Sequence, residues 1–326
     1  MTAPQDVAGS ATEARPEAVV EGMGSAIQGR SLGQIAWQRL KRDKVALGGA
    51  GVIVFLILVA VFAPLIVSAL GHDPLEFHQE QVDPDLQISP KFFGGISPQF
   101  LFGVEPVNGR DIFSRVVYGA RISLLIAFFA TLVAVLVGVL AGVVAGYFGG
   151  WVDTLISRIM DIFLAFPILL FAFALVGIIP QQAFGLQGET LRLVLIVAII
   201  GLSSWPYIGR IIRGQTLSLR EREFIDAARS PRILFSELLP NLVAPILVYS
   251  TLLIPTNILF EAALSFLGVG IPPPAPSWGG MLSDATHWFQ IAPNFMVFPG
   301  LAIFVTVLAF NLFGDGLRDA LDPRSR

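Results

Sequence analysis

Long apolar runs separated by polar segments dominate this chain from residue 45 onward. Runs with few or no charged residues occupy positions 45–70, 122–146, 155–179, 191–212, 242–267 and 295–313. A helix needs about 20 apolar residues to cross the hydrocarbon core of a bilayer. The pattern therefore predicts an all-α polytopic membrane protein with six transmembrane helices, of which the last is the shortest.

The N-terminal region has a different composition. Residues 1–34 are rich in Ala, Gly, Glu and Pro without periodicity, which predicts a disordered tail. Residues 35–44 predict a short interfacial helix with a basic face, and residues 35–326 form the predicted membrane domain. The first apolar run begins too late and is too long for a signal peptide.

The overall composition supports a membrane protein and excludes several other classes. Of the 326 residues, 54% are hydrophobic and 14% are charged, whereas soluble domains have about 25% charged residues. A net charge of −3 gives no case for nucleic-acid binding. The absence of cysteine excludes disulfides and cysteine-ligated metals. Three histidines are too few and too scattered for a His-rich metal site.

The distribution of Lys and Arg predicts the orientation. With the N-terminus inside, 16 of the 21 Lys and Arg residues fall in inside segments, as expected for cytoplasmic loops. Both termini are then cytoplasmic, residues 71–120 form an extracytoplasmic loop, and residues 213–240 form a cytoplasmic coupling region. The outside segment 271–280 is too rich in proline for a regular helix.

Glycines repeat every four residues in the second predicted span. Gly138, Gly142 and Gly146 are followed by Gly150 at the same spacing. Helices in lipid associate by close backbone approach at small residues, so this face predicts tight packing. The favoured interpretation is packing within the chain, and the other is contact with a sister subunit.

Two acidic residues fall within the predicted spans. An ionisable group at membrane depth is costly and is a functional candidate by default. Asp161 is near the cytoplasmic end of its span with Arg158 three residues before it, so an intrahelical ion pair is the simpler interpretation. Glu261 is near the outer end of its span and either lines a gate or reaches interfacial water.

No catalytic constellation is present in the sequence. It contains no G-x-x-x-x-G-K-[ST] phosphate loop, no H-E-x-x-H and no G-x-S-x-G. We therefore expect no enzymatic activity, no catalytic residue, no cofactor and no bound metal in this chain.

The charged segment 220–229 between two predicted spans is the strongest functional signal. In a helix, Phe224, Ala227 and Ala228 fall on one face, flanked by Glu223 and Asp226. Small residues on that face allow another protein to pack closely against it. The alternative is a solvated helix on the membrane surface.

Several motifs resemble one family. Residues 223–228, followed by Leu-Pro-Asn at 239–241, resemble the E-A-A loop of ABC-importer permease subunits, with Asp226 where that motif usually has Glu. Further resemblances follow in the order of that family, at 102–124, 160–167, 261–279 and 314–324. Together they cover about residues 35–326 and are similar to the dipeptide/oligopeptide (and nickel) importer group, C-type subunit.

The resemblance implies an ABC importer permease fold and an assembly. The chain would pair with a second permease subunit in the bacterial cell membrane and form a path for peptides. Two ATP-binding subunits, where ATP hydrolysis is expected, would dock on the helix through Glu223, Phe224, Asp226, Ala227, Ala228 and Arg229. An extracytoplasmic substrate-binding protein would deliver the substrate. The alternative is a self-sufficient secondary transporter or channel, which would require intramembrane charge pairs or broken helices related by an internal repeat.

The sequence departs from the family pattern at two places. Residues 104–108 read Val-Glu-Pro-Val-Asn, where the family has a Thr-Asp pair and a shorter spacer. The coupling region also lacks the family's glycine after Ala228, and it reaches residues 239–241 several residues early. We expect this shortening to affect the coupling to the ATPases rather than the fold.

Overall fold

The computed structural model describes residues 32–180, 182–220 and 238–322. Within these residues the protein is mostly helical, with long loops and one small antiparallel hairpin. The α-helices are α1 (Leu32–Leu40), α2 (Lys44–Val61), α3 (Ala63–Leu70), α4 (Phe92–Gly95), α5 (Ile112–Phe148), α6 (Gly150–Ala165), α7 (Ile168–Ile178), α8 (Gly188–Arg220), α10 (Leu239–Phe266), α11 (Trp278–Ala285) and α12 (Asn294–Leu321). A 3-10 helix covers Gln79–Gln81, and the hairpin strands are β1 (Gln182–Ala183) and β2 (Leu186–Gln187).

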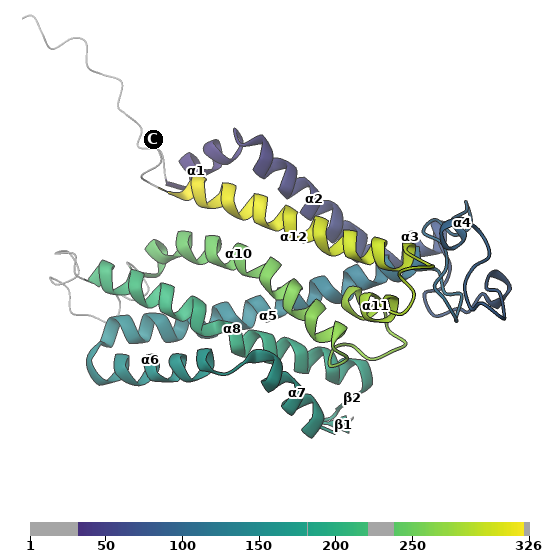
Figure 1. The fold of residues 1–326 in the computed structure, drawn as a ribbon. Coiled ribbons are helices and arrows are strands. Elements are labelled where there is room, and N and C mark those ends of the chain that lie inside the picture. Colours follow the sequence, from purple (N-terminus) through teal and green to yellow (C-terminus); the bar gives the residue numbers. More distant parts are fainter. Residues whose placement is uncertain (1–31, 181, 221–237, 323–326) are drawn as a thin grey trace, which may run out of the picture.

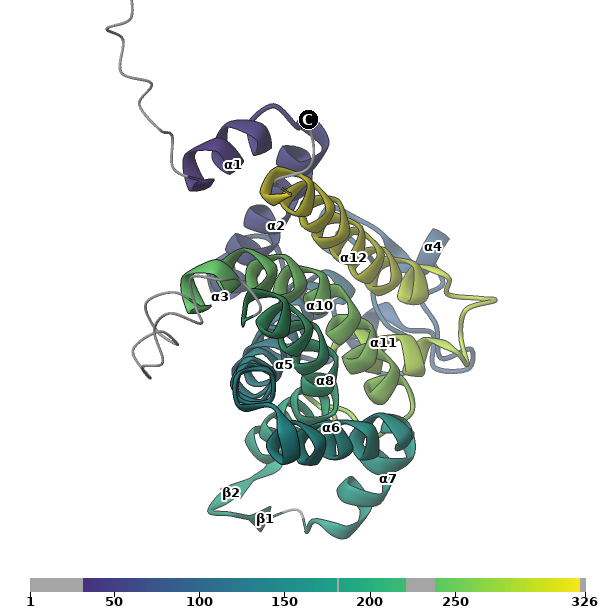
Figure 2. The same ribbon diagram turned by 90° about the vertical axis from the view of Figure 1, so that its left-hand side faces the viewer.

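The long helices run between two ends of the molecule (Figure 1). We call the end that carries α1 and the last turn of α12 the terminal end. The opposite end, which carries residues 71–111, the β-hairpin and residues 267–293, is the loop end. Seen from the terminal end, α5 and α8 lie at the centre, with α2 and α12 on one side and α6 on the other (Figure 2).

In the described part of the chain, five helices are long and apolar enough to cross a membrane, namely α2, α5, α8, α10 and α12. The third predicted span, 155–179, is not one straight helix. It is the bent pair α6 and α7, whose axes differ by 82°. Pro167 lacks an N–H group and disfavours helical geometry in Phe166, which adopts an extended conformation instead. Counting this pair as one span gives the predicted six.

The helix that contains the second span begins before the predicted apolar run. Helix α5 starts at Ile112, so residues 112–120, which we had placed in the 71–120 loop, are helical. Asp111 caps this helix because its carboxylate accepts bonds from the Phe113 and Ser114 amides at 3.1 and 3.3 Å. Similarly, α1 begins at Leu32, inside the predicted tail, and α11 begins at Trp278, inside the predicted non-helical segment 271–280.

Glycines on α5 bring its backbone against α8. A Cβ atom at Gly138 would lie 2.7 Å from the Trp205 carbonyl oxygen, and one at Gly142 would lie 2.6 Å from that of Gly209. A Cβ atom at Gly146 would lie 2.7 Å from the Cβ of Thr216. The predicted small-residue face therefore packs within the chain, whereas Gly150 has nothing nearby and opens α6 with a positive φ.

A buried charged cluster ties the loop-end segments together. Glu105 pairs with Arg110 and with Arg115, whose Nε is 3.1 Å from the Glu105 Oε2 atom. The Arg115 guanidinium also donates to the carbonyls of Pro74 and Pro274, at 3.1 and 3.3 Å. Burial raises the pKa of the nearby Asp284 carboxyl, and Arg115 partly opposes this effect. Two distant loops are thereby fixed to the first turn of α5.

Candidate functional site: a polar face on α6, α8 and α10

The predicted ATPase-coupling residues cannot be placed. Glu223, Phe224, Asp226, Ala227, Ala228 and Arg229 lie outside the described residues. The helices on either side of this segment are described: α8 ends at Arg220 and α10 begins at Leu239, both at the terminal end (Figure 1). The coupling role therefore stays a prediction, and the two helices that would transmit it are defined.

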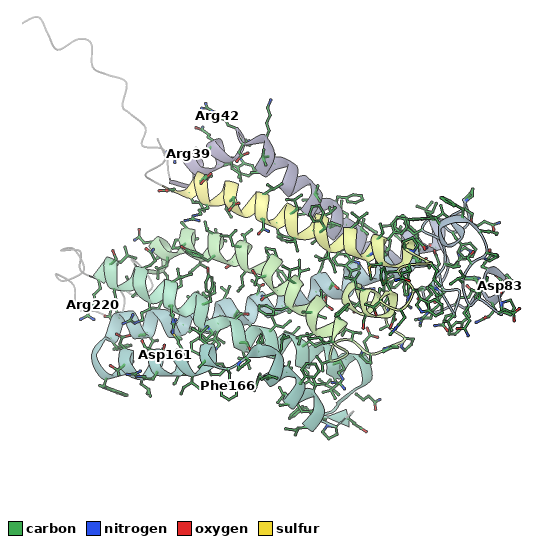
Figure 3. All side chains as sticks on the ribbon, viewed as in Figure 1. Arg39, Arg42, Asp83, Asp161, Phe166 and Arg220 are labelled. Atoms are coloured by element: carbon green, nitrogen blue, oxygen red, sulfur yellow. The ribbon has the colours of Figure 1, made fainter. Side chains whose placement is uncertain are left out.

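Asp161 forms a bridge between helices. Its carboxylate lies 2.5 Å from the guanidinium of Arg210 on α8 and 3.8 Å from that of Arg158. The intrahelical pair predicted from the sequence is present but is the longer of the two contacts. The Asp161 and Arg210 side chains are 49% and 52% exposed, so this pair lies on the surface of the helix bundle. Figure 3 shows Asp161 on α6, on the terminal-end side of Phe166.

A second ion pair connects the same two helices closer to the terminal end. Asp153 on α6 accepts two bonds from the Arg213 guanidinium, one of them 2.7 Å long. Its side chain is 19% exposed, so this pair is more enclosed than the Asp161 pair. The two ion pairs fix α6 against α8 on the terminal-end side of the bend between α6 and α7.

Hydroxyl side chains continue this surface toward the loop end. Ser203 and Tyr207 lie four residues apart on α8, in line with Arg210, and Thr256 is on the facing side of α10. They line a groove of about 460 Å³ that also contains aromatic rings. The other lining residues are Phe163, Leu164, Phe166, Ile168, Ser204, Leu252, Leu253 and Phe260. We call the surface formed by Asp161, Ser203, Tyr207, Arg210 and Thr256 the polar face.

The helix break supplies one wall of this groove. Phe163 and Phe166 precede the bend and Ile168 follows it, and all three also line an adjacent pocket of about 210 Å³. Phe166 is 62% exposed. A straight helix through residues 155–179 would not present this arrangement.

A buried polar network lies behind the groove. The Asn257 amide donates to the Thr131 hydroxyl at 2.9 Å, and the Ser204 hydroxyl donates to the Asn257 carbonyl oxygen at 3.3 Å. These residues join α10, α5 and α8. Because a polar group buried without a partner is costly, the network fixes the relative positions of the three helices.

Glu261 is away from the polar face. Its side chain is fully buried, and the Ser265 hydroxyl donates to its Oε1 atom at 2.7 Å. The expectation that it reaches interfacial water is wrong, because Glu261 is fully buried, and Gly270 and the first turn of α11 at Gly279 pack against Ser265 and Ala262 beside it. Its role as a gate stays a prediction.

Sequence reasoning missed the hydroxyl side chains of the polar face. Ser203, Tyr207 and Arg210 recur at helical spacing on α8, a polar stripe that could have been found within the span. The stripe formed by Leu252, Thr256 and Phe260 is mostly apolar, so its sequence gave little warning. Only the packing of α6, α8 and α10 brings these residues together.

Comparison with known proteins identifies the family. Residues 138–326 match the family described as the binding-protein-dependent transport system inner membrane component. The chain belongs to this family. Residues 31–88 match the N-terminal TM domain of oligopeptide transport permease C. These matches confirm the resemblance seen in the motifs: the chain is a multi-pass membrane permease component of a bacterial ABC importer.

Named relatives cover nearly the whole permease. The dipeptide transport system permease protein DppC of Alkalihalophilus pseudofirmus is 44% identical over 296 residues, or 89% of this chain and 90% of the relative. The glutathione transport system permease protein GsiD of Salmonella paratyphi A is 44% identical over 293 residues, covering 88% and 89%.

A solved structure shares the fold. It describes inward-facing conformations of the MetNI methionine ABC transporter, and the matched chain has a TM-score of 0.52 and 17% sequence identity. The match covers 65% of this permease and 98% of that chain. The predicted permease fold is therefore confirmed.

Proposed function

We propose that this permease forms, with a second permease subunit, the path by which an ATP-driven importer moves small peptides across the membrane. The names of the relatives support peptides as the substrate class, since one transports dipeptides and another glutathione. The observation that carries the proposal is the polar face, with its exposed charges and hydroxyls on membrane helices.

Lipid is an unsuitable environment for such a face. Charged and hydrogen-bonding side chains in membrane helices face other helices or water-filled cavities because hydrocarbon cannot solvate them. Asp161, Arg210 and Tyr207 are each about half exposed in the single chain. A second permease opposite this face would enclose a water-filled space between the two subunits.

The chemistry of the groove suits small peptides of varied sequence. Hydroxyls such as those of Ser203, Tyr207 and Thr256 both donate and accept hydrogen bonds, as peptide groups require. The rings of Phe163 and Phe260 offer apolar surface that accepts different side chains. Mixed linings of this kind, with a few polar groups among apolar ones, are typical of small-molecule sites.

The charge distribution supports an orientation with the termini inside. Sixteen of the 21 Lys and Arg residues belong to segments predicted from the sequence to be cytoplasmic, as expected for cytoplasmic termini. The loop end then faces outward, where a substrate-binding protein would deliver the peptide. In this orientation α8 enters the coupling segment directly from the polar face.

Coupling to two ATP-binding subunits would act through residues 223–229. Helix α8 precedes this segment in the chain and α10 follows it, and residues of both helices line the groove. A movement of the docked ATPases would therefore shift Tyr207 on α8 and Thr256 on α10 relative to one another. The ATP is hydrolysed in those partners, and the permease itself performs no chemistry.

Purification of the tagged chain from its native membrane tests the assembly. Gentle solubilisation followed by mass spectrometry should recover a second permease and two ATP-binding subunits. Recovery of the second permease alone would indicate that the shortened coupling region does not hold the ATPases. Recovery of the chain alone would contradict the proposal and favour a self-sufficient secondary transporter.

Single-cysteine labelling tests the path, because the chain has no native cysteine. In the assembled importer, Tyr207→Cys should react with a water-soluble, membrane-permeant maleimide, whereas Phe128→Cys, an equally exposed position elsewhere, should not. Labelling after denaturation gives the total for each variant. If both cysteines are equally protected from the maleimide, the result would count against a water-filled path at the polar face.

A further inference from the structure

A second groove lies between α2, α5, α10 and α12, away from the polar face. Its volume is about 480 Å³ and its surface is almost entirely apolar. The lining residues are Ile57, Ala60, Val61, Arg121, Leu124, Leu125, Phe128, Ile254 and Phe310. Phe128 and Val61 are 55% and 63% exposed, so the groove is open along one side.

Arg121 is the one charged residue among those that line this groove. Its side chain is exposed and makes no ion pair with any residue in the described part of the chain. Arg210 and Arg213 on α8 differ, since each pairs with a carboxylate. This cation at the rim of an apolar groove is open to a counter-ion from outside the chain.

The position of Arg121 along α5 fixes the level of that counter-ion. It lies nine residues after Ile112, about 14 Å along the helix axis. No charged residue follows it in the remainder of α5. Arg121 therefore marks the loop-end boundary of the apolar span, the level at which lipid headgroups meet the hydrocarbon core.

The groove extends from this boundary into the apolar span. Leu124, Leu125 and Phe128 follow Arg121 by one to two helical turns, and Ile57 and Val61 face them from the last turns of α2. Ile254 and Phe310, from the middle of α10 and α12, complete the lining. A cation at the level of the lipid headgroups thus lies at the loop-end limit of a continuous apolar groove.

We propose that this groove holds an anionic phospholipid, with its phosphate on the Arg121 guanidinium and one acyl chain between α2 and α5. A guanidinium binds phosphate through two parallel hydrogen bonds, which makes the contact both strong and directional. A phospholipid carries both a phosphate and an acyl chain. Its phosphate lies at headgroup level and its acyl chain lies deeper in the bilayer, as Arg121 and the apolar groove do. A helix of another subunit would have to place an acidic residue at that one level.

The bound lipid would join α2 to the rest of the bundle. Helix α2 packs mainly on α12 and less extensively on α5, and the groove occupies the remaining space on that side. Filling it with an acyl chain replaces missing side-chain contacts between α2 and α5. The lipid therefore acts as a structural component of this permease.

Native mass spectrometry of the purified importer tests the proposal. Phosphatidylglycerol and phosphatidylcholine with identical acyl chains are titrated into the delipidated complex. The wild-type protein should retain one phosphatidylglycerol preferentially. Arg121→Gln should weaken that retention about tenfold, equivalent to one charge-assisted pair, and leave phosphatidylcholine unchanged.

Three variants identify the cause of any change. Lys91→Gln removes another exposed cation at the loop end and should leave lipid retention as in the wild type. Arg121→Lys keeps the charge without the paired donors and should be intermediate. Leu125→Trp fills the groove from an exposed position and should reduce the retention of both lipids.

A photo-crosslinking residue at position 128 identifies the occupant directly. In the intact importer it should cross-link to phospholipid. Cross-linking to a second polypeptide would overturn the proposal and assign the groove to a subunit interface. Equal retention of both lipids by the wild type and by Arg121→Gln would also overturn it.

Discussion

Two aromatic residues that line different grooves of the bundle have nearly equal exposure and different surroundings. Tyr207 on α8 is 54% exposed beside Arg210 and hydroxyl groups, and Phe128 on α5 is 55% exposed among aliphatic side chains. In a soluble protein both would contact water. In a membrane permease the polar face requires water or protein, whereas the apolar groove suits lipid. Exposure alone therefore does not identify the solvent, and the chemistry of the neighbouring side chains does.

The largest effect is expected at the contact between α5 and α8, because α5 lines the apolar groove and α8 carries most of the polar face. Gly142→Leu would place a side chain where even a Cβ atom lies 2.6 Å from a backbone carbonyl oxygen. We expect α5 and α8 to separate, with a cost of at least about 3 kcal/mol, and loss of monodisperse protein in detergent gel filtration. Gly51→Leu on α2, where nothing lies within 4 Å, is the matched control. Equal recovery of the two variants would contradict the importance of this contact.

The next effect compares the two faces directly. Phe128→Asp exposes a carboxylate to lipid and should cost on the order of 2 kcal/mol, seen as a lower level of assembled importer in membranes. Tyr207→Asp places the same group on the polar face and should leave assembly close to that of the wild type. Immunoblots of membrane fractions measure both. If the two variants assemble equally well, the two faces do not differ in their surroundings.

A smaller effect is expected in the buried network behind the polar face. Asn257→Leu leaves the hydroxyls of Thr131 and Ser204 without their shared partner. The cost should be about 1–2 kcal/mol and should appear as a lower unfolding temperature in detergent. Asn311→Leu, at an exposed position on α12, controls for the change in side chain. An unchanged unfolding temperature for Asn257→Leu would show that the network contributes nothing.

The smallest effect tests whether the polar face is wet. A double-mutant cycle with Asp161→Asn and Arg210→Gln should give a coupling energy of about 0.5 kcal/mol, because a pair exposed to water contributes little. Thermal unfolding of the four proteins measures it. A coupling energy above about 2 kcal/mol would mean that the pair lies in a dry subunit interface instead.

The helical class and the approximate spans were predictable from local sequence. An apolar run of about 20 residues satisfies the thickness of the hydrocarbon core whatever its neighbours are, so α2, α5, α8, α10 and α12 lie where the runs lie. The early start of α5 was also encoded locally, in the cap formed by Asp111, but hydropathy alone does not detect caps. The family resemblance was likewise local, because its motifs are short segments in a fixed order.

Tertiary structure decided which residues meet. The sequence supplied Asp161 with a partner three residues away, yet its shorter contact is with Arg210 on another helix. Glu261 was placed by its distance from the span end, yet it is completely buried, and the segment that leads into α11 packs against the residues beside it. Such outcomes depend on how each helix is rotated about its axis and where a helix bends. Those choices are set by packing between segments distant in the chain, here by glycines against α8 and by the break at Pro167.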